Sequence, residues 1–561
     1  MERPWLRHYD DGVPATLAPY PQKTLVDVVR ETAAERPHHT ATIFKRARLS
    51  YGDLDRLSDR FAGSLAARGI GRGERVALLM PNCPQLIVSQ LGAWKAGAAV
   101  VPLNPLSSDE ELVRTLTDTS PRAAVVLTRF YDKIKRLQPS TALAVVIATN
   151  IKEFLPPLLR LAYTLLKERT AGDRVTLKPG DAWLRALMRD PQAVTPRPAP
   201  SPSDPALLLL TGGTTGIPKA AVLRHHALLM AALQVRRWFQ PILREWDDPL
   251  ACVFPLFHVA GNVGVLGAAL VGRWPAVLVP NPRDLKDLLR IIERERPALL
   301  PGVPTLYHAL LSHPAVQAGK VDFSSVKLCV SGATPLHAET KRRFEALTGA
   351  RIIEVYSLTE ACMAAVATPV LGTCKEGAVG IPLPDVHLRI VDADDPSRDL
   401  GPGEIGEIVI VAPQLMDGYW RDPEATQEML RQDRLYTGDL GSLDEDGYLT
   451  IADRKKDLIK ASGFQVWPRE VEEVIATHQA VAEVGVAGVP DAYQGEAVMA
   501  WVVTRKGMTP TENGIRDHCR QHLAAYKIPK RVEFRDALPK SPIGKVLRRE
   551  LVREFRAAHP V

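Results

Sequence analysis

Short runs of aliphatic and β-branched residues alternate with amphipathic stretches from Leu25 to about Leu449, and Gly and Pro residues mark the turns between them. Residues 75–80 predict a buried strand, residues 84–96 a helix and residues 99–102 the next strand. Further strands are expected at 206–210, 250–254, 326–330 and 351–355. Strands that alternate with helices usually pair in parallel, so this pattern predicts an α/β lobe of doubly wound sheets.

The pattern changes towards the C-terminus. Residues 387–392 and 404–411 alternate or run apolar between turn residues, which predicts a small β-subdomain after Gly380. The charged segment 453–457 then precedes a stretch with its own β and α signals, and 561 residues exceed the usual size of one domain. We therefore expect a large N-terminal lobe over 1–452, a hinge at 453–457 and a mobile small α+β domain over 458–561.

Composition excludes several classes of protein. Hydrophobic residues at 46%, charged residues at 24% and a mean hydropathy of −0.07 are typical of a globular chain with a large core. The longest apolar stretch, 259–271, is too short to span a bilayer, and the N-terminus lacks a secretory signal, so a cytoplasmic location is expected. The six cysteines contain no CxxC pair, which predicts buried free thiols. The net charge of +7 permits anionic partners without selecting one.

A loop rich in glycine and threonine follows the strand expected at 206–210. Glycines let backbone N–H groups approach a phosphate, threonine hydroxyls add donors, and a lysine supplies a compact positive charge. The loop is not a Walker A motif. Taken alone it could also be a solvated turn. The candidate phosphate-binding residues are Thr211, Gly212, Gly213, Thr214, Thr215, Gly216 and Lys219.

This loop resembles the phosphate-binding signature of the adenylate-forming superfamily, which comprises acyl-CoA synthetases, peptide-synthetase adenylation domains and luciferases. Gly212 replaces a common serine, and Ala220 replaces the final glycine. Further motifs of the superfamily follow in order over nearly the whole chain. They are Pro-Leu-Phe-His-Val-Ala at 255–260, Ser-Gly-Ala-Thr-Pro-Leu at 331–336, Tyr-Ser-Leu-Thr-Glu at 356–360, Tyr-Thr-Gly-Asp-Leu at 436–440, Asp-Arg-Lys-Lys-Asp-Leu-Ile-Lys at 453–460 and Pro-Lys-Ser-Pro-Ile-Gly-Lys at 539–545.

The resemblance implies a nucleotide site and a metal site. Glu360 is expected to bind Mg²⁺, with Thr211 as a second metal-site residue, and Thr359 to contact the α-phosphate. Asp439 and Arg454 are expected to hold the ribose. The adenine would lie against Gly332, Ala333, Thr334 and Tyr356. Outside this context Glu360 would be a helix-start residue and Asp439 a turn residue.

The resemblance also implies residues for the two half-reactions. Lys545 is expected to hold the substrate carboxylate and the α-phosphate during adenylation, and His258 to border the acyl carboxylate and the CoA channel. Lys456 matches the hinge about which the small domain swings. Lys460 and Gly463 match the CoA channel. Alternatives from the residues alone are a structural histidine at 258 and a surface lysine at 545.

The implied activity is ATP-dependent ligation of a long-chain fatty acid to CoA through an acyl-adenylate, with release of AMP and pyrophosphate and with Mg²⁺ as cofactor. Long-chain ligases are favoured by the Gly212-Gly213 form of the loop, the opening at 4–14 and the insertion around 155–161. Small residues after His258 favour either an acyl tunnel or tight packing; they are Gly261, Gly264, Gly267 and Ala268. Alternatives are an aryl or medium-chain acyl-CoA ligase, a ligase that passes the acyl group to a carrier protein, and a catalytically silent lipid-binding protein at the membrane surface.

Residues 151–169 carry leucines at helical spacing among basic residues. A helix that starts at Pro156-Pro157 would lie in the interface of the inner face of the membrane as a peripheral contact, or would pack on its own domain. The expected partners are fatty acid, ATP and CoA, without nucleic acid. The oligomeric state stays open, with a homodimer as one alternative.

Overall fold

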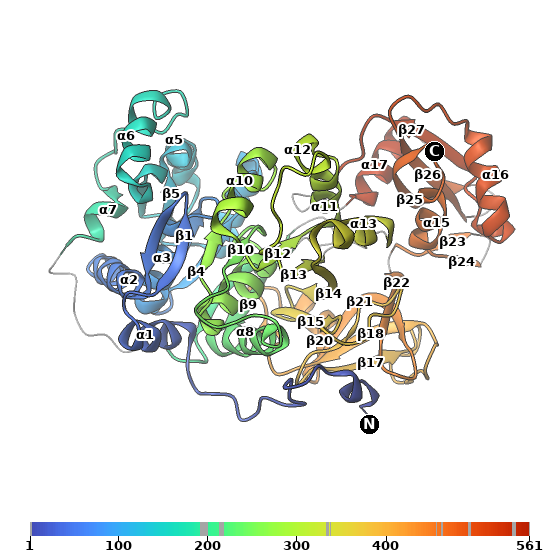
Figure 1. Cartoon of the computed structure of the whole chain (residues 1–561), viewed down its shortest axis with the longest axis horizontal. Helices are drawn as coiled ribbons and strands as arrows, with labels where there is room; N and C mark the ends of the chain where they lie inside the picture. Colours follow the sequence, from blue (N-terminus) through green and yellow to red (C-terminus); the bar gives the residue numbers. More distant parts are fainter. Residues whose placement is uncertain are drawn as a thin grey trace.

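The computed structural model in Figure 1 describes residues 3–190, 200–211, 218–332, 336, 338–455, 457–461, 464–491, 495–540 and 546–559. Two large, mostly parallel sheets form the N-terminal lobe. A third, smaller sheet, called the β-unit, flanks them, and a fourth sheet with its helices forms the C-terminal part. The expected α/β class, with a large sheet lobe and a small C-terminal domain, is confirmed. The β-unit after Gly380 is also present.

The first large sheet has eight strands. Their spatial order is β19 (Gly418–Tyr419), β9 (Ala220–Arg224), β8 (Pro205–Leu210), β4 (Ala99–Leu103), β3 (Arg75–Leu79), β5 (Ala123–Leu127), β6 (Val145–Thr149) and β7 (Ala182–Trp183). The strands from β8 to β7 in this order pair in parallel, whereas β9 and β19 are antiparallel.

The second large sheet has nine strands. Their order is β16 (Ile381–Pro382), β15 (Met363–Ala367), β14 (Arg351–Leu358), β13 (Leu328–Ser331), β12 (Leu299–Gly302), β10 (Leu250–Cys252), β11 (Ala276–Leu278), β1 (Thr40–Phe44) and β2 (Ala47–Ser50). Its strands are parallel from β14 to β1 and antiparallel at both edges.

Helices cover both faces of both sheets, because alternate residues of a strand point to opposite faces. On β3, Val76 and Leu78 join the core between the sheets, while Ala77 and Leu79 are buried in a second core beneath the outer helices. The helices between the sheets are α1 (Leu25–Glu35), α2 (Tyr51–Ala66), α3 (Pro84–Lys95), α8 (His225–Phe239) and α9 (Ala268–Gly272). The outer helices are α4 (Asp109–Thr119) and α5 (Thr128–Leu137) on one side and α10 (Leu285–Glu295), α11 (Pro304–Leu311), α12 (Pro314–Gln317) and α13 (Ala338–Thr348) on the other.

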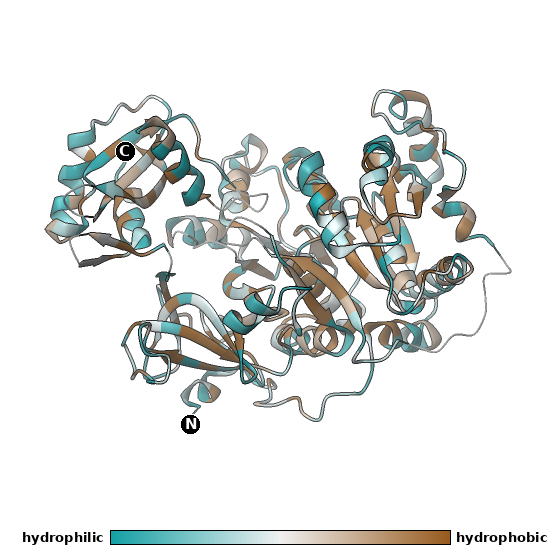
Figure 2. Cartoon of the chain, turned by 180° about the vertical axis from the view of Figure 1, so that it is seen from behind, coloured by the Kyte–Doolittle hydropathy of each residue, from teal (hydrophilic) through white to brown (hydrophobic). Residues whose placement is uncertain are grey.

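The small β-unit and the C-terminal part complete the chain. The β-unit contains β17 (His387–Val391), β18 (Gly406–Val411), β20 (Leu430–Arg431), β21 (Arg434–Leu443) and β22 (Leu449–Arg454), with α14 (Pro423–Met429) beside it. The C-terminal sheet contains β23 (Ile459–Ala461), β24 (Phe464–Val466), β25 (Val481–Asp491), β26 (Gly495–Thr504) and β27 (Arg531–Arg535). Its helices are α15 (Pro468–Ala476), α16 (Glu512–His522) and α17 (Arg548–Ala558). Figure 2 shows hydrophobic strands inside and mixed helices outside.

The helix expected to start at Pro156-Pro157 is α6 (Pro157–Leu166), so this expectation is confirmed. A 3₁₀ turn over Ile151–Phe154 precedes it, and Leu155 lies between the two and packs on the core. The segment after His258 is a π-helical turn, η5 (Ala260–Gly267). All six cysteines are free as expected, but Cys374 is only half-buried. No helix among the described residues is long and apolar enough to cross a membrane.

Candidate active site

The predicted adenine-binding segment begins where β13 ends. Ser331 is the last residue of β13 and pairs in register with Glu354 on β14. A Cβ on Gly332 would lie 2.8 Å from Val355 Cγ2, so glycine is needed for this close approach. The Ser331 hydroxyl is buried and has no hydrogen-bond partner among the described residues. An unsatisfied buried hydroxyl at a sheet's carboxyl edge is available to a ligand.

Asp439 is the centre of the first polar cluster. It lies on β21 directly opposite Arg454 on β22, and Arg454 Nε donates to Asp439 Oδ1 at 3.0 Å. Tyr356, near the end of β14, donates its hydroxyl to Asp439 Oδ2 at 2.7 Å. Burial, reinforced by the Asp439 charge, raises the pKa of Tyr356 well above its usual value, so the phenol stays a donor. The three side chains predicted for one nucleoside therefore meet at one point.

Glu360 is the centre of the second polar cluster. Its carboxylate is buried, and the Tyr419 hydroxyl donates to Oε1 at 2.6 Å. Burial and the neighbouring carboxylate raise the pKa of Tyr419. Lys219 Nζ lies 5.5 Å from the centre of the Tyr419 ring and 3.4 Å from a carboxylate oxygen of Asp422.

The base of the glycine-rich loop lies at this cluster, because Lys219, which contacts Tyr419, also accepts a hydrogen bond on its carbonyl oxygen from Thr211 N at 2.8 Å. Thr211 itself is buried. Tyr419 reaches the cluster through β19, which pairs Tyr419 with Ala221 on β9. The loop base, an acid and a cation thus share one corner of the fold.

Some of the remaining predicted site residues lie within the described part of the chain, and the others lie outside it. Thr359 is half-buried, and its carbonyl accepts a hydrogen bond from Cys362 N. His258 follows β10 and is partly withdrawn from water, which lowers its pKa and favours the neutral imidazole. Lys460 lies on β23. Outside the described residues lie Gly212, Gly213, Thr214, Thr215, Gly216, Ala333, Thr334, Lys456, Gly463 and Lys545.

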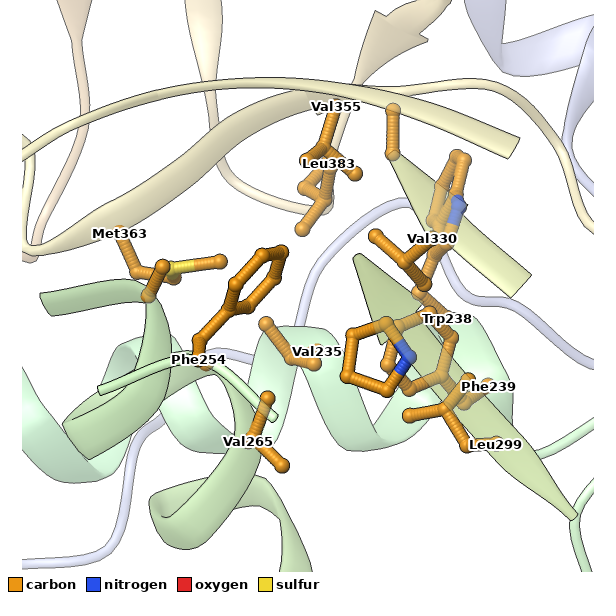
Figure 3. Close-up of a pocket in the computed structure, with 14 residues that line it drawn as sticks. Val235, Trp238, Phe239, Phe254, Val265, Leu299, Val330, Val355, Met363 and Leu383 are labelled. Carbon is orange, nitrogen blue, oxygen red and sulfur yellow. The ribbon is translucent and has the colours of Figure 1, made fainter. Parts of the chain in front are cut away.

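A cavity lined by apolar residues lies among the strands that carry these polar residues. Figure 3 shows side chains from α8, η5 and the central strands pointing toward one space. Val330 directly precedes Ser331, Val355 directly precedes Tyr356, and Met363 lies three residues after Glu360. Only about 20 Å³ admits the centre of a water molecule, roughly the room for one or two waters. The cavity is therefore narrow.

Met363 narrows this cavity. A Cβ on Gly264 would lie 2.6 Å from Met363 Sδ, so the absence of a side chain at Gly264 provides the space that the methionine fills. Met363 has φ +130° and Cys362 has φ +54°, conformations that non-glycine residues rarely adopt. By contrast, a Cβ on Gly261 would lie 2.6 Å from the carbonyl oxygen of Phe254, so that glycine serves backbone packing. Close packing therefore explains the absence of a side chain at both glycines, and the acyl tunnel stays a prediction.

Sequence reasoning missed Tyr419 and Met363. Neither residue belongs to a motif that the spacing singled out. Tyr419 becomes adjacent to Glu360 only through pairing between strands almost two hundred residues apart. The strain at Met363 depends on the turn after Glu360, and φ cannot be read from residue types other than glycine and proline. Asp422 was missed for the same reason as Tyr419.

Comparisons with known proteins agree with this arrangement. The family model described as AMP-binding enzyme matches residues 29–420, and that of the AMP-binding enzyme C-terminal domain matches 470–545. Long-chain-fatty-acid–CoA ligase of Bacillus subtilis is 36% identical over 100% of this chain and 99% of the relative. The enzyme of that name from Escherichia coli O157:H7 is 35% identical over 99% of each.

Solved structures show the same fold. ATP-bound MatB from Rhodopseudomonas palustris has a TM-score of 0.82 and 30% identity over 95% of this chain and 99% of that one. A Mycobacterium tuberculosis fatty acyl CoA synthetase has a TM-score of 0.72 and 27% identity over 95% and 99%. With both family models in order and full-length relatives at this identity, the chain belongs to the AMP-binding enzyme family.

Proposed function

We propose that this protein is an ATP-dependent ligase that joins a long-chain fatty acid to CoA through an acyl-adenylate, releasing AMP and pyrophosphate. The observation that carries the proposal is the full-length similarity to long-chain-fatty-acid–CoA ligases, at 36% identity over 100% of this chain. The apolar cavity supports it, because its walls include residues close in sequence to the two polar clusters, and Met363 would have to move before an acyl chain could enter. A fatty acid needs both environments at once. Its chain must leave water, and its carboxylate must meet the α-phosphate.

The Asp439 cluster suits a ribose. Each carboxylate oxygen already accepts one hydrogen bond, from Arg454 or from Tyr356, and retains a further lone pair. Two ribose hydroxyls could therefore donate to Asp439 without displacing its protein partners. Tyr356 and Arg454 would fix the carboxylate's orientation before the nucleotide arrives, which reduces the entropy lost on binding.

The Glu360 cluster suits a magnesium ion that accompanies the nucleotide. Oε1 accepts the Tyr419 hydroxyl, and Oε2 accepts no hydrogen bond within the described ranges. No group of three or more His, Cys, Asp or Glu ligands occurs in the described part of the chain. Mg²⁺ commonly binds one or two carboxylates together with substrate phosphates and water, so one carboxylate beside a phosphate loop fits its needs. When bound, the ion would offset the charge of the phosphates.

The other chemical steps need positioning groups rather than a protein nucleophile, because the carboxylate itself attacks the α-phosphorus. We assign Lys545 to holding the reacting carboxylate and α-phosphate, and Lys219 with Thr211 to the leaving phosphates. His258, which burial keeps neutral, would border the acyl carboxylate without adding charge. The hinge at Lys456 and the CoA-channel residues Lys460 and Gly463 would serve thioester formation.

The rival substrate class is an aryl or medium-chain acid. 4-coumarate–CoA ligase 1 of Solanum tuberosum is 32% identical over 90% of this chain and 88% of the relative, and an anthranilate CoA ligase has a TM-score of 0.83 at 26% identity over 98% and 100%. We expect palmitate to give the highest kcat/KM in an assay of CoA-dependent AMP release. A preference for benzoate, coumarate or octanoate over palmitate would replace the long-chain assignment. If the rate of AMP release did not depend on CoA, CoA would not be the acyl acceptor, and that part of the proposal would be wrong.

A long-chain acid is poorly soluble and partitions into membranes. We therefore also propose that the enzyme acts on the cytoplasmic side of the membrane as a peripheral protein. Fractionation of cells at low and high ionic strength tests this proposal. A peripheral protein pellets with membranes at low salt and leaves them at high salt.

A further inference from the structure

Helix α6 exposes its apolar side. It stands at the outer edge of the large lobe, away from the β-unit and the C-terminal part (Figures 1 and 2). None of its ten residues is buried. Of twelve large apolar side chains that are exposed among the described residues, five lie on this helix, so the exposure is concentrated. These are Leu158 at 83%, Leu159 at 41%, Leu161 at 58%, Leu165 at 73% and Leu166 at 75%.

The inner side of α6 holds the helix in place through polar contacts. The Tyr163 hydroxyl donates to a carboxylate oxygen of Asp173, which also binds Arg129 at 2.8 Å. After the helix, Glu168 accepts from Asn150 at 3.0 Å and pairs with Lys152 at 2.6 Å. Folding therefore does not require burial of the leucines. An amphipathic helix normally buries its apolar stripe, and α6 presents that stripe outward.

The exposed charged residues that follow α6 closely along the chain have one sign. Lys167, Arg169 and Arg174 are exposed, and none of them has an ion pair with a described residue. The nearby acids are already neutralised, Glu168 by Lys152 and Asp173 by Arg129. Exposed leucines with such cations close to them in sequence complement a bilayer, whose interior is apolar and whose boundary is anionic.

We propose that α6 is a membrane-docking helix, whose leucines enter the outer acyl region of an anionic bilayer while Lys167, Arg169 and Arg174 contact the lipid phosphates. A helix that lies in the interface plane needs a broad apolar stripe and flanking cations, and α6 has both. The inference rests on the proposed function in one respect: a membrane is where a long-chain acid is concentrated. Its test does not depend on catalysis.

The test is co-sedimentation of the full chain with vesicles of equal parts phosphatidylglycerol and phosphatidylcholine. We expect the wild type to bind these vesicles, to bind pure phosphatidylcholine much more weakly, and to be released by high salt. Leu158→Ser, Leu161→Ser and Leu165→Ser together should weaken binding about a hundredfold or more, because each leucine loses its burial in lipid. The matched control replaces three exposed apolar residues elsewhere, Leu347→Ser, Leu371→Ser and Ile405→Ser, and should bind like the wild type.

A second variant covers the case in which the triple variant unfolds. Leu165→Cys labelled with an environment-sensitive dye should show a blue-shifted emission on vesicles, whereas the same dye at Leu371→Cys should not. Equal binding by the triple variant and the wild type, or a dye that stays in water, would overturn the proposal. It would also be overturned if the wild type dimerised without lipid and the triple variant were monomeric, because a second copy would then cover the leucines. Loss of vesicle binding with unchanged turnover of a soluble short acid separates docking from catalysis.

Discussion

Gly264→Ala should shorten the acyl chain that the enzyme prefers. Gly264 lines the cavity, and a Cβ there would lie 2.6 Å from Met363 Sδ. The end of a methionine side chain is flexible, so the new methyl should push it further into the cavity rather than unfold the protein. Gly264 has no positive φ and lies in η5, so alanine adds no backbone strain.

The size of the effect follows from the space lost. A displaced thioether end removes room for about one or two methylene groups, each worth about 0.8 kcal/mol on burial. Palmitate should therefore lose about 1–1.5 kcal/mol of transition-state binding, or about 5–15-fold in kcat/KM. The kcat/KM with octanoate should change little, because its shorter chain should not reach Met363. The assay is CoA-dependent AMP release with both acids.

A second substitution distinguishes occlusion from general damage. Met363→Ala combined with Gly264→Ala should restore the palmitate-to-octanoate ratio, because the side chain that blocks the cavity is gone. Gly267→Ala is the matched control on the same turn, since its Cβ would make only an ordinary 3.4 Å contact with Ala232. If Gly264→Ala lowers kcat/KM equally with palmitate and octanoate, Met363 does not limit the acyl pocket. The same conclusion follows if the double variant keeps the altered ratio of the two kcat/KM values.

Four further changes test the polar groups and a buried histidine. Lys545→Ala should slow adenylation about a hundredfold or more while thioester formation from synthetic acyl-adenylate survives; equal losses in both half-reactions would contradict its role. Lys456→Pro should allow adenylate formation and prevent thioester formation, because proline fixes φ, and normal overall turnover would place the hinge elsewhere. Tyr419→Phe should lower kcat/KM about 10- to 100-fold and alter the Mg²⁺ titration, since Glu360 loses a hydrogen bond worth about 1.5–3 kcal/mol; an unchanged titration would exclude this. Burial lowers the pKa of His225 to about 4, against about 6.5 in the unfolded chain. The free energy of unfolding measured in urea should therefore fall as the pH drops from 6.5 toward 4, by at most about 1.4 kcal/mol per pH unit. His225→Gln should flatten that slope.

Local sequence patterns predicted the central elements well, and the structure shows where they fail. The strand expected at 75–80 is β3 over Arg75–Leu79, and the helix expected at 84–96 is α3 over Pro84–Lys95. The strand expected at 250–254 ends at Cys252, shortly before Pro255 and the turn that leads to His258. Apolarity continues to Phe254 because that side chain lines the cavity. Hydrophobic runs thus record burial, and burial continues beyond the last strand residue.

The candidate site was predictable only where a motif carries its residues. Tyr356, Asp439 and Arg454 were assigned to one nucleotide by resemblance, and the structure places them in one hydrogen-bonded cluster. Their meeting depends on β14 of the large lobe and the β21–β22 pair of the β-unit. Tyr419 carried no comparable signal, because its contact with Glu360 arises from long-range strand pairing. Contacts of this kind depend on topology, which a single sequence specifies only indirectly.

The turn between β14 and β15 connects the polar cluster at Glu360 with the apolar cavity at Met363. Glu360 faces the phosphate-loop corner, and Met363, three residues later, lines the apolar cavity. The intervening backbone is strained at Cys362 and Met363, at a cost of about 1–3 kcal/mol for each residue. Two contacts hold it there: β14–β15 pairing, which includes Leu358 with Met363, and the bond from Met416 N to Glu360 O at 2.8 Å. One short and constrained turn therefore holds both the carboxylate at the phosphate-loop corner and the thioether at the apolar cavity.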